Sequence, residues 1–203
     1  EGYECEKIAI EKIKHFVSKE AFNIDGFGKK IVENFWKIKL IKLPQDIFKL
    51  DYKKIENLEG WGNLSVSNLK YSIDSKKNIS LDKFIYSLGI RHIGLENAKL
   101  LAKHLKSSDN FFKLSSAKNM SELSNIDGIG ETQIKSIKSF FSKKINLNIL
   151  KKLKENMEIF DAIISKKGGI FKNKTFMFTG KLSEISRAEA KSLVEQNSGK
   201  IIS

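Results

Sequence analysis

A six-residue motif returns at a regular interval along this chain. NIDGFG at residues 23–28 recurs as NIDGIG at residues 125–130, and the looser copies NLEGWG and GIRHIG lie at residues 57–62 and 89–94. The final glycines of the four copies, at intervals of 34, 32 and 36 residues, are Gly28, Gly62, Gly94 and Gly130. Each interval fits two short helices, so the sequence predicts four copies of one helical unit.

Apolar residues follow each of these glycines at fixed positions. Every copy has an apolar residue four and seven positions after the glycine, and the last three copies have another after eleven. They are Val32, Phe35, Val66, Leu69, Ile73, Ala98, Leu101, Leu105, Ile134, Ile137 and Phe141. This spacing places them on one face of a helix that begins at the same point in each copy. Each copy is therefore predicted to be helix, tight glycine turn and helix, and the fold to be mainly α.

Three further helices are predicted from apolar periodicity. The first would contain Ile8, Ile13, Phe16 and Val17. An interior helix leading into the third copy would contain Leu81, Phe84, Ile85 and Leu88. Residues 145–164, with Leu150, Leu153 and Ile163, would form an exit helix.

Three of the four turns share the pattern apolar–acidic–Gly–apolar–Gly. The middle apolar residue, Phe27, Trp61 or Ile129, is expected to pack between the helices and hold the turn rigid. The glycines would leave backbone N–H groups open at the start of the second helix, where they and the helix dipole can bind a phosphate. Such contacts hold a nucleic acid strand without reading its bases. For any single copy, the alternative is a helical hairpin that uses glycine only to turn.

The third copy departs from this pattern because His92 stands where the others carry the first glycine. Its turn is expected to lie further from a bound strand, with Arg91 contacting a phosphate instead. The acidic residues Asp25, Glu59 and Asp127 are isolated in sequence and would repel DNA, which favours a turn-stabilising role over a metal-dependent nuclease site.

The repeated turn is the helix-hairpin-helix pattern of proteins that bind DNA without sequence specificity. The candidate DNA-binding residues are Gly26, Gly28, Lys29, Gly60, Gly62, Arg91, His92, Gly94, Gly128 and Gly130. The net charge of +13 and the pI of about 9.6 suit a nucleic-acid binder. Lys supplies 35 of the 37 basic residues, as AT-rich codon usage would also produce, so the charge alone does not decide the function.

Residues 22–35, 87–105 and 123–141 closely resemble segments of bacterial NAD⁺-dependent DNA ligases. The order and spacing agree from about residue 8 to residue 165. The resemblance implies a DNA-binding domain of four helix-hairpin-helix units at residues 8–165. This domain would bend round nicked double-stranded DNA from the minor-groove side and help to hold the nicked strands in line.

Cys5 matches the last ligand of the four-cysteine zinc module that precedes this domain in those ligases. The resemblance therefore implies that residues 1–7 are the tail of such a module, with Cys5 as a Zn²⁺ ligand in the full enzyme. A closed structural zinc site needs four ligands, and the other three are not in this chain. We therefore expect the chain on its own to bind no zinc at Cys5.

Residues 166–203 resemble the start of a BRCT domain, which implies an incomplete α/β segment. A strand is predicted at residues 175–179, a capping box at residues 186–189 beginning a helix, Gly199 as the C-cap, and a second strand from Lys200. In phosphopeptide-binding BRCT domains, a pair such as Thr179-Gly180 holds the phosphate. Here a strand end and a turn is the favoured interpretation of that pair.

Ligases of this family form a lysyl-AMP at a Lys-x-Asp-Gly motif, which this chain lacks. We therefore predict no catalytic residue, NAD⁺ and Mg²⁺ sites outside the chain, and no ligase activity for this portion alone. The single cysteine and the lack of a long apolar run or secretory signal predict a cytoplasmic protein. The resemblance to bacterial ligases implies that this is a bacterial cytoplasm and that the protein associates with the nucleoid. A monomer with no membrane contact is expected.

Other functions stay open at this point. A tandem helix-hairpin-helix module of a nuclease or branch-migration protein would share the repeats. A glycosylase of this class would place a catalytic Asp beyond a Pro-Gly hairpin, but the single proline, Pro44, lies outside every hairpin. The chain could also be a protein-interaction scaffold with an incidental basic surface. DNA affinity that falls steeply with ionic strength, as expected if many phosphates are neutralised, would argue against that function.

Overall fold

The computed structural model describes residues 3, 5–162, 169–179, 190, 193–195 and 197–202. The chain divides into two compact units, Glu1–Ala162 and Ile163–Ser203. The described part of the first unit is mainly helical, and that of the second contains two short paired strands. The sequence-based boundary was placed between residues 165 and 166.

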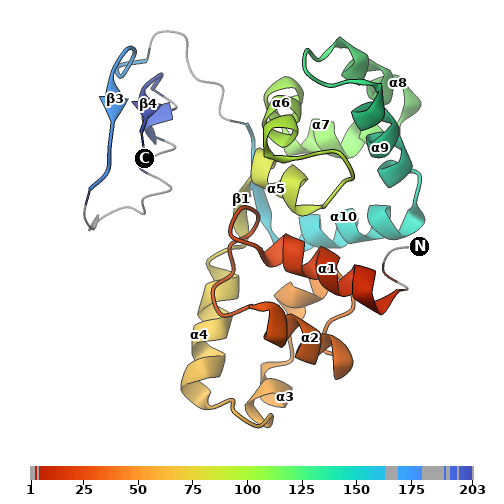
Figure 1. Cartoon of the computed structure of the whole chain (residues 1–203), viewed down its shortest axis with the longest axis vertical. Helices are drawn as coiled ribbons and strands as arrows, with labels where there is room; N and C mark the ends of the chain where they lie inside the picture. Colours follow the sequence, from red (N-terminus) through yellow and green to blue (C-terminus); the bar gives the residue numbers. More distant parts are fainter. Residues whose placement is uncertain are drawn as a thin grey trace. The chain divides into compact units, whose positions relative to one another are not determined.

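The helical unit (Figure 1) runs through its elements in the following order. They are α1 (Glu6–Val17), α2 (Lys29–Lys37), η1 (Pro44–Lys49), α3 (Tyr52–Glu56), α4 (Asn63–Asp74), β1 (Asn78–Ser80), α5 (Leu81–Ser87), α6 (Leu95–Leu105), α7 (Ser108–Phe112), η2 (Lys113–Ser115), α8 (Ala117–Ser121), η3 (Glu122–Asn125), α9 (Glu131–Phe141), α10 (Lys144–Asn156) and β2 (Glu158–Phe160). We call α1–α4 the first half and α5–α9 the second half.

The predicted phase of the repeated helices is confirmed. α2, α4, α6 and α9 each begin one residue after the final glycine of a motif copy. All the apolar residues predicted four, seven and eleven positions later are buried. The stripe forms because residues at these spacings lie one above another on a helix and leave water together.

Aromatic side chains link the helices inside each half. In the first half, Phe27 and Trp61 both contact the ring of Phe35 on α2, with ring centroids 5.7 and 5.6 Å apart. In the second half, Phe111 on α7 contacts Phe84 on α5 and Phe141 on α9. Each half therefore has two motif copies packed around shared rings.

The two halves are joined by several elements of the chain. β1, which follows the first half, pairs in parallel with β2, with Ile79 opposite Ile159. α10 packs against η1 and lies between the two halves in Figure 1. α1 also contacts α5 through His15 and Tyr86.

The predicted exit helix is too long. α10 ends at Asn156, and the chain then becomes extended at Met157 and forms β2. The backbone N–H of Glu158 donates to the carbonyl of Lys77 at 2.8 Å. A pairing partner about eighty residues earlier thus outweighs the helical periodicity of residues 157–162. Residues 163 and 164 of the prediction lie outside the described residues.

In the second unit, β3 (Thr175–Phe176) pairs in parallel with β4 (Lys200–Ile201). The strand predicted at residues 175–179 is therefore shorter than expected. The helix end differs from the predicted Gly199 cap, because Ser198 takes the left-handed position (φ +65°). The N–H of Gly199 donates to Val194 and that of Ser198 to Glu195, which is a Schellman ending with Gly199 one position further on.

Gly199 is nevertheless required for packing, because a Cβ there would lie 2.6 Å from Cγ1 of Val194. The predicted capping box at residues 186–189, and Gly180 of the Thr179-Gly180 pair, lie outside the described residues. Among the described helices, none has the length and apolar character needed to span a membrane.

Candidate nucleic-acid interface

The four motif copies form turns with the same backbone. We call them turn 1 (residues 24–27), turn 2 (58–61), turn 3 (90–93) and turn 4 (126–129). In each, the last N–H donates to the first carbonyl, at 3.3, 3.1, 3.0 and 3.1 Å. The third residue has a positive φ in every turn, at Gly26 (+78°), Gly60 (+81°), His92 (+63°) and Gly128 (+86°). This combination is the type II turn, which normally requires glycine at the third position.

Turn 3 has the same backbone conformation as the others, although His92 replaces the first glycine. Its predicted greater distance from a bound strand stays a prediction. His92 adopts the left-handed conformation of the three glycines, and Gly94 precedes α6 as the final glycines precede the other helices. The Asn97 side-chain amide donates to the His92 carbonyl at 3.0 Å. Arg91 and His92 are both exposed, so the side chains that sequence analysis selected at this turn face solvent.

The middle apolar residues of turns 1, 3 and 4 anchor these turns in the core, as predicted for turns 1 and 4. Phe27 and Ile129 are 3% and 6% exposed, and Ile93, which sequence analysis did not select, is 5% exposed. Trp61 differs because it is only partly buried, with its ring against Phe35. Because these side chains are fixed in the core, the backbone beside them is held in one position.

The final glycine of each copy is not required by the conformation of the chain. Gly28, Gly62, Gly94 and Gly130 are the N-cap residues of their helices, with φ of −71°, −113°, −84° and −90°. Any residue can adopt these angles. A Cβ at Gly28, Gly62 or Gly94 would meet no atom within 4 Å. A side chain there would therefore project into open space, where it would obstruct only a molecule that approaches from outside.

The helix starts behind these glycines are not capped by side chains. No side-chain cap is found at Gly28, Gly62, Gly94 or Gly130. Among the residues that the structure describes, no acceptor is found for the N–H groups of Gly28, Lys29 and Lys30 at the start of α2. Exposed donors at the positive end of a helix dipole attract an anion such as a phosphate.

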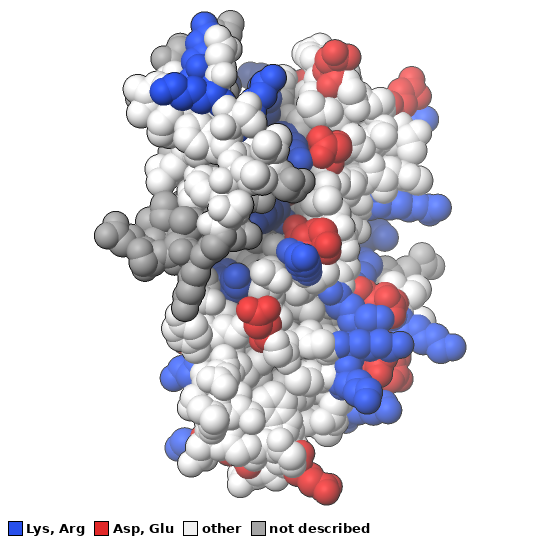
Figure 2. All heavy atoms as spheres, turned by 60° about the vertical axis from the view of Figure 1, so that its left-hand side comes forward, with Lys and Arg blue, Asp and Glu red and all other residues white. Residues whose placement is uncertain are grey.

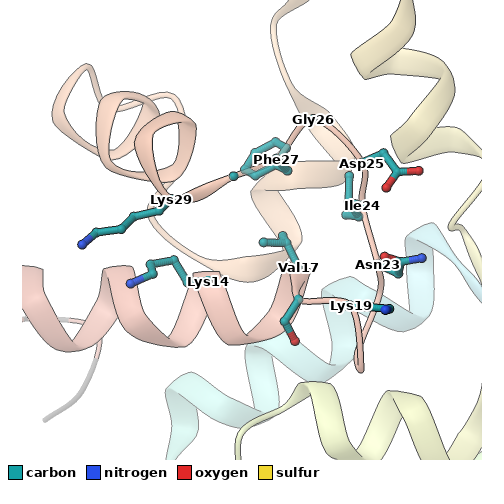
Figure 3. A pocket seen from close by; sticks show the side chains of 11 residues that line it. Lys14, Val17, Lys19, Asn23, Ile24, Asp25, Gly26, Phe27 and Lys29 are labelled. Atoms are coloured by element: carbon teal, nitrogen blue, oxygen red, sulfur yellow. The ribbon is translucent and has the colours of Figure 1, made fainter.

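A hollow of about 360 Å³ lies beside turn 1 (Figure 3). Its lining includes Gly26 and Gly28 together with three lysines, Lys14, Lys19 and Lys29. Lys14 comes from α1 and Lys29 from α2, and in Figure 3 the two side chains extend toward the same side. Sequence analysis selected Lys29 but missed Lys14 and Lys19, because they precede the motif and no spacing rule connects them to it.

A second hollow, of about 460 Å³, lies between turn 1 and turn 2. Gly26 and Gly60 both line it, with Trp61 and the polar residues Ser65 and Asn68 of α4. Sequence analysis missed Ser65 and Asn68, although their three-residue spacing places them on one helix face. Turns 1 and 2 are thus brought to the two sides of one hollow.

Charge is unevenly distributed over the face that Figure 2 shows. The region over α4 is largely without charged side chains, whereas Lys and Arg gather with acidic residues toward the lower right of that view. On α4, Leu64 and Tyr71 are 76% and 77% exposed. On this face, the part of α4 without charged side chains lies next to the hollow between turns 1 and 2.

Cys5 is exposed and precedes α1 as its N-cap residue. Within the described part of the chain, no three His, Cys, Asp or Glu side chains come close enough together to hold a metal ion. Asp25, Glu59 and Asp127 are exposed, one in each of turns 1, 2 and 4.

Comparison with known proteins agrees with this geometry. The family model for the helix-hairpin-helix motif matches residues 83–150, a stretch that contains turns 3 and 4. The third copy, which has His92 in place of the first glycine, therefore lies inside the matched region.

The chain is 72% identical over all its 203 residues to a DNA ligase of Pelagibacter ubique (strain HTCC1062). It is 42% identical over 212 aligned positions, covering 98% of the chain, to a DNA ligase of Rickettsia massiliae (strain Mtu5). The identity to a DNA ligase of Wolbachia pipientis is also 42%, over 94% of the chain. The chain spans only about 30% of the length of these enzymes. The expected resemblance to DNA ligases is confirmed: nearly the whole chain is homologous to one segment of each of these bacterial enzymes.

Proposed function

We propose that this chain is the DNA-binding portion of an NAD⁺-dependent DNA ligase that seals nicks in duplex DNA during replication and repair. Turns 1 to 4 act as four helix-hairpin-helix units that bind phosphates of nicked double-stranded DNA. The sites that bind NAD⁺ and Mg²⁺ in the full enzyme lie outside this chain. The protein acts as a monomer, in the cytoplasm and at the nucleoid.

The observation that carries the proposal is the empty space around the final glycines. The first glycine of turns 1, 2 and 4 is explained by its positive φ, but Gly28, Gly62 and Gly94 have ordinary angles and no neighbour to avoid. A residue without a side chain at such a site is useful when a partner must approach the backbone closely. The uncapped helix starts identify the chemistry of that partner as anionic, which suits the DNA phosphates.

In this proposal the chain contributes position and no reactive group. Its phosphate contacts hold the two strands at a nick in line, which lowers the entropic part of the barrier to joining them. Asp25, Glu59 and Asp127 stabilise turns and do not hold a catalytic metal. The chain has no Lys-x-Asp-Gly sequence, so adenylation belongs to another part of the polypeptide.

The proposal extends to the flanking segments. Residues 1–7 are the tail of a four-cysteine zinc module to which Cys5 contributes one ligand, and residues 8–165 are the DNA-binding domain. Residues 166–203 are a linker and the first part of a BRCT domain. The parallel pair of β3 and β4 on either side of a helix end supports a strand–helix–strand arrangement at this position.

Titration with DNA at several salt concentrations tests the proposal. If each of the four turns neutralises one phosphate, the slope of log K against log salt should be about −4. Nicked and intact duplexes should bind with this slope, and single-stranded DNA should bind more weakly. A salt-independent affinity would contradict binding through the phosphates, and no affinity for DNA at all would contradict DNA binding and favour the scaffold alternative.

Incubation with NAD⁺ and Mg²⁺, followed by mass spectrometry, tests the assignment of the chemistry. We expect the mass of the chain to stay unchanged because it offers no adenylation lysine. A gain equal to one AMP would show that the chain carries out the first ligase step itself.

A further inference from the structure

One side chain connects the first half to the second half close to their turns. Nε2 of His15 lies 2.7 Å from the carbonyl oxygen of Tyr86. A carbonyl oxygen only accepts, so Nε2 must carry the proton and donate. The rings of His15 and Tyr86 are also in contact, with centroids 4.6 Å apart and planes tilted by 60°. Two contacts thus fix both the distance and the orientation of the two side chains.

His15 and Tyr86 lie just before turns 1 and 3, so their contact can affect the distance between these turns. His15 lies in the last turn of α1, and the chain then enters the segment that contains turn 1. Tyr86 lies in the last turn of α5, and turn 3 follows. A shift between His15 and Tyr86 would therefore be carried directly into the separation of turns 1 and 3, because each helix and its turn move as one packed piece.

Gly89, the first residue of the third motif copy, leaves space for the His15 ring. Gly89 has φ +59°, and a Cβ there would lie 3.3 Å from Cδ2 of His15. Gly89 therefore meets two demands, a left-handed backbone and close approach of an imidazole. At this first position of the motif, the other three copies have Asn.

One turn before His15, Lys12 of α1 comes near Lys143, and this approach of two like charges does not hold α1 in place. The pKa of Lys12, also on α1, is lowered first by burial and then by the nearby ammonium of Lys143. These like charges repel each other across the approach of α1 to the segment before α10. The hydrogen bond and the ring contact of His15, in contrast, join α1 directly to α5.

We propose that His15 is a positioning residue that sets the distance between turns 1 and 3, so that both halves bind one duplex at the same time. This inference rests on the proposed DNA-binding function. Two linked sites gain affinity only when their spacing lets them bind together, and they lose that gain when the spacing is not held. His15 contributes through this spacing and not through a contact with DNA.

The test compares a short duplex with a long one. A duplex of about 10 base pairs offers one helical turn, which a single half can bind, and one of about 20 base pairs can engage both halves. The variants are His15→Ala, which removes both contacts, and His15→Gln, whose amide nitrogen can replace the Nε2 donor. His104→Ala, which removes an exposed histidine of α6, is the matched control. Thermal unfolding is measured for all of them.

We expect His15→Ala to bind the long duplex roughly tenfold more weakly than the unmodified chain and the short duplex equally well. His15→Gln should recover most of the loss, and His104→Ala should bind both duplexes like the unmodified chain. Unchanged binding of the long duplex by His15→Ala would overturn the inference. An equal loss on both duplexes, with a lower unfolding temperature, would also overturn it, because His15 would then be an ordinary packing residue. Failure of the unmodified chain to bind either duplex would instead reject the proposed function.

Discussion

Turns 1 and 2 have the same backbone conformation as turns 3 and 4, but the helices that follow them begin in different surroundings. α2 and α4 have no acidic residue in their first turn, and α2 begins with Lys29. α6 and α9 carry Glu96 and Glu131 at the corresponding places, with ion pairs to Lys99 and Lys135 at 2.9 and 3.3 Å. The four turns thus have the same backbone conformation, but the first turns of the helices that follow them carry different charges.

The space around the glycines differs only at turn 4. A Cβ at Gly28, Gly62 or Gly94 would meet nothing, whereas one at Gly130 would lie 3.2 Å from the Gln133 side chain and one at Gly128 2.9 Å from Leu100. A helix start that carries its own carboxylate already has part of its positive potential neutralised. Under the proposed function, the comparison predicts that turns 1 and 2 bind phosphate more strongly than turns 3 and 4.

The largest expected effect comes from filling the open helix starts with carboxylates. Gly28→Asp combined with Gly62→Asp should weaken binding of nicked duplex roughly a hundredfold, because two charge-assisted phosphate contacts are lost. Asp is a better N-cap than Gly, so the unfolding temperature should stay the same or rise. Electrophoretic titration and calorimetry measure the two quantities.

The matched pair, Gly94→Asp with Gly130→Asp, should weaken binding only about tenfold, because α6 and α9 already carry carboxylates. Equal losses for the two double variants would break the comparison between the halves.

A smaller effect is expected from Lys29→Gln. Lys29 lines the hollow beside turn 1, and the acidic group paired with it, Glu33, is 3.8 Å away. Removing this ammonium should lower affinity by about fivefold and reduce the salt slope by about one unit. Lys135→Gln is the control at turn 4, and an identical change in slope there would show that the two halves bind phosphate alike.

Removing the carboxylates of the second half should act in the opposite direction. Glu96→Gln with Glu131→Gln should raise affinity for duplex about threefold, because like-charge repulsion near the phosphates disappears. The same change should lower the free energy of unfolding by about 0.3–1 kcal/mol at each helix start. Affinity that stays constant while stability falls would mean that turns 3 and 4 lie away from the DNA.

The smallest effect concerns the one turn without glycine at its third position. His92→Gly should raise the free energy of unfolding by about 1 kcal/mol, because the left-handed backbone is costly for residues other than glycine. Gly128→Ala is the converse change and should lower it by at least as much, since a Cβ there also approaches Leu100. Denaturant unfolding of both variants measures the difference, and a less stable His92→Gly variant would show that the imidazole compensates for its backbone.

The helices and turns could be predicted because their signals are local. Val32 and Phe35 lie within one helix, and Phe27 lies within one turn, so short-range spacing is sufficient to place them. The site was only partly predictable. Lys14 reaches the hollow of turn 1 from the preceding helix, and Asn68 reaches the hollow between turns 1 and 2 from α4, and neither belongs to a repeated motif.

By itself, the sequence determined the repeated unit, the phase of its helices and the glycine turns that join them, because these depend on residues a few positions apart. Only the tertiary structure decided which glycines are needed for conformation and which stand in open space. It also decided that β2 interrupts the exit helix, and that His15 meets Tyr86, 71 residues further along the chain. These features depend on packing between segments remote in sequence, which no local pattern encodes.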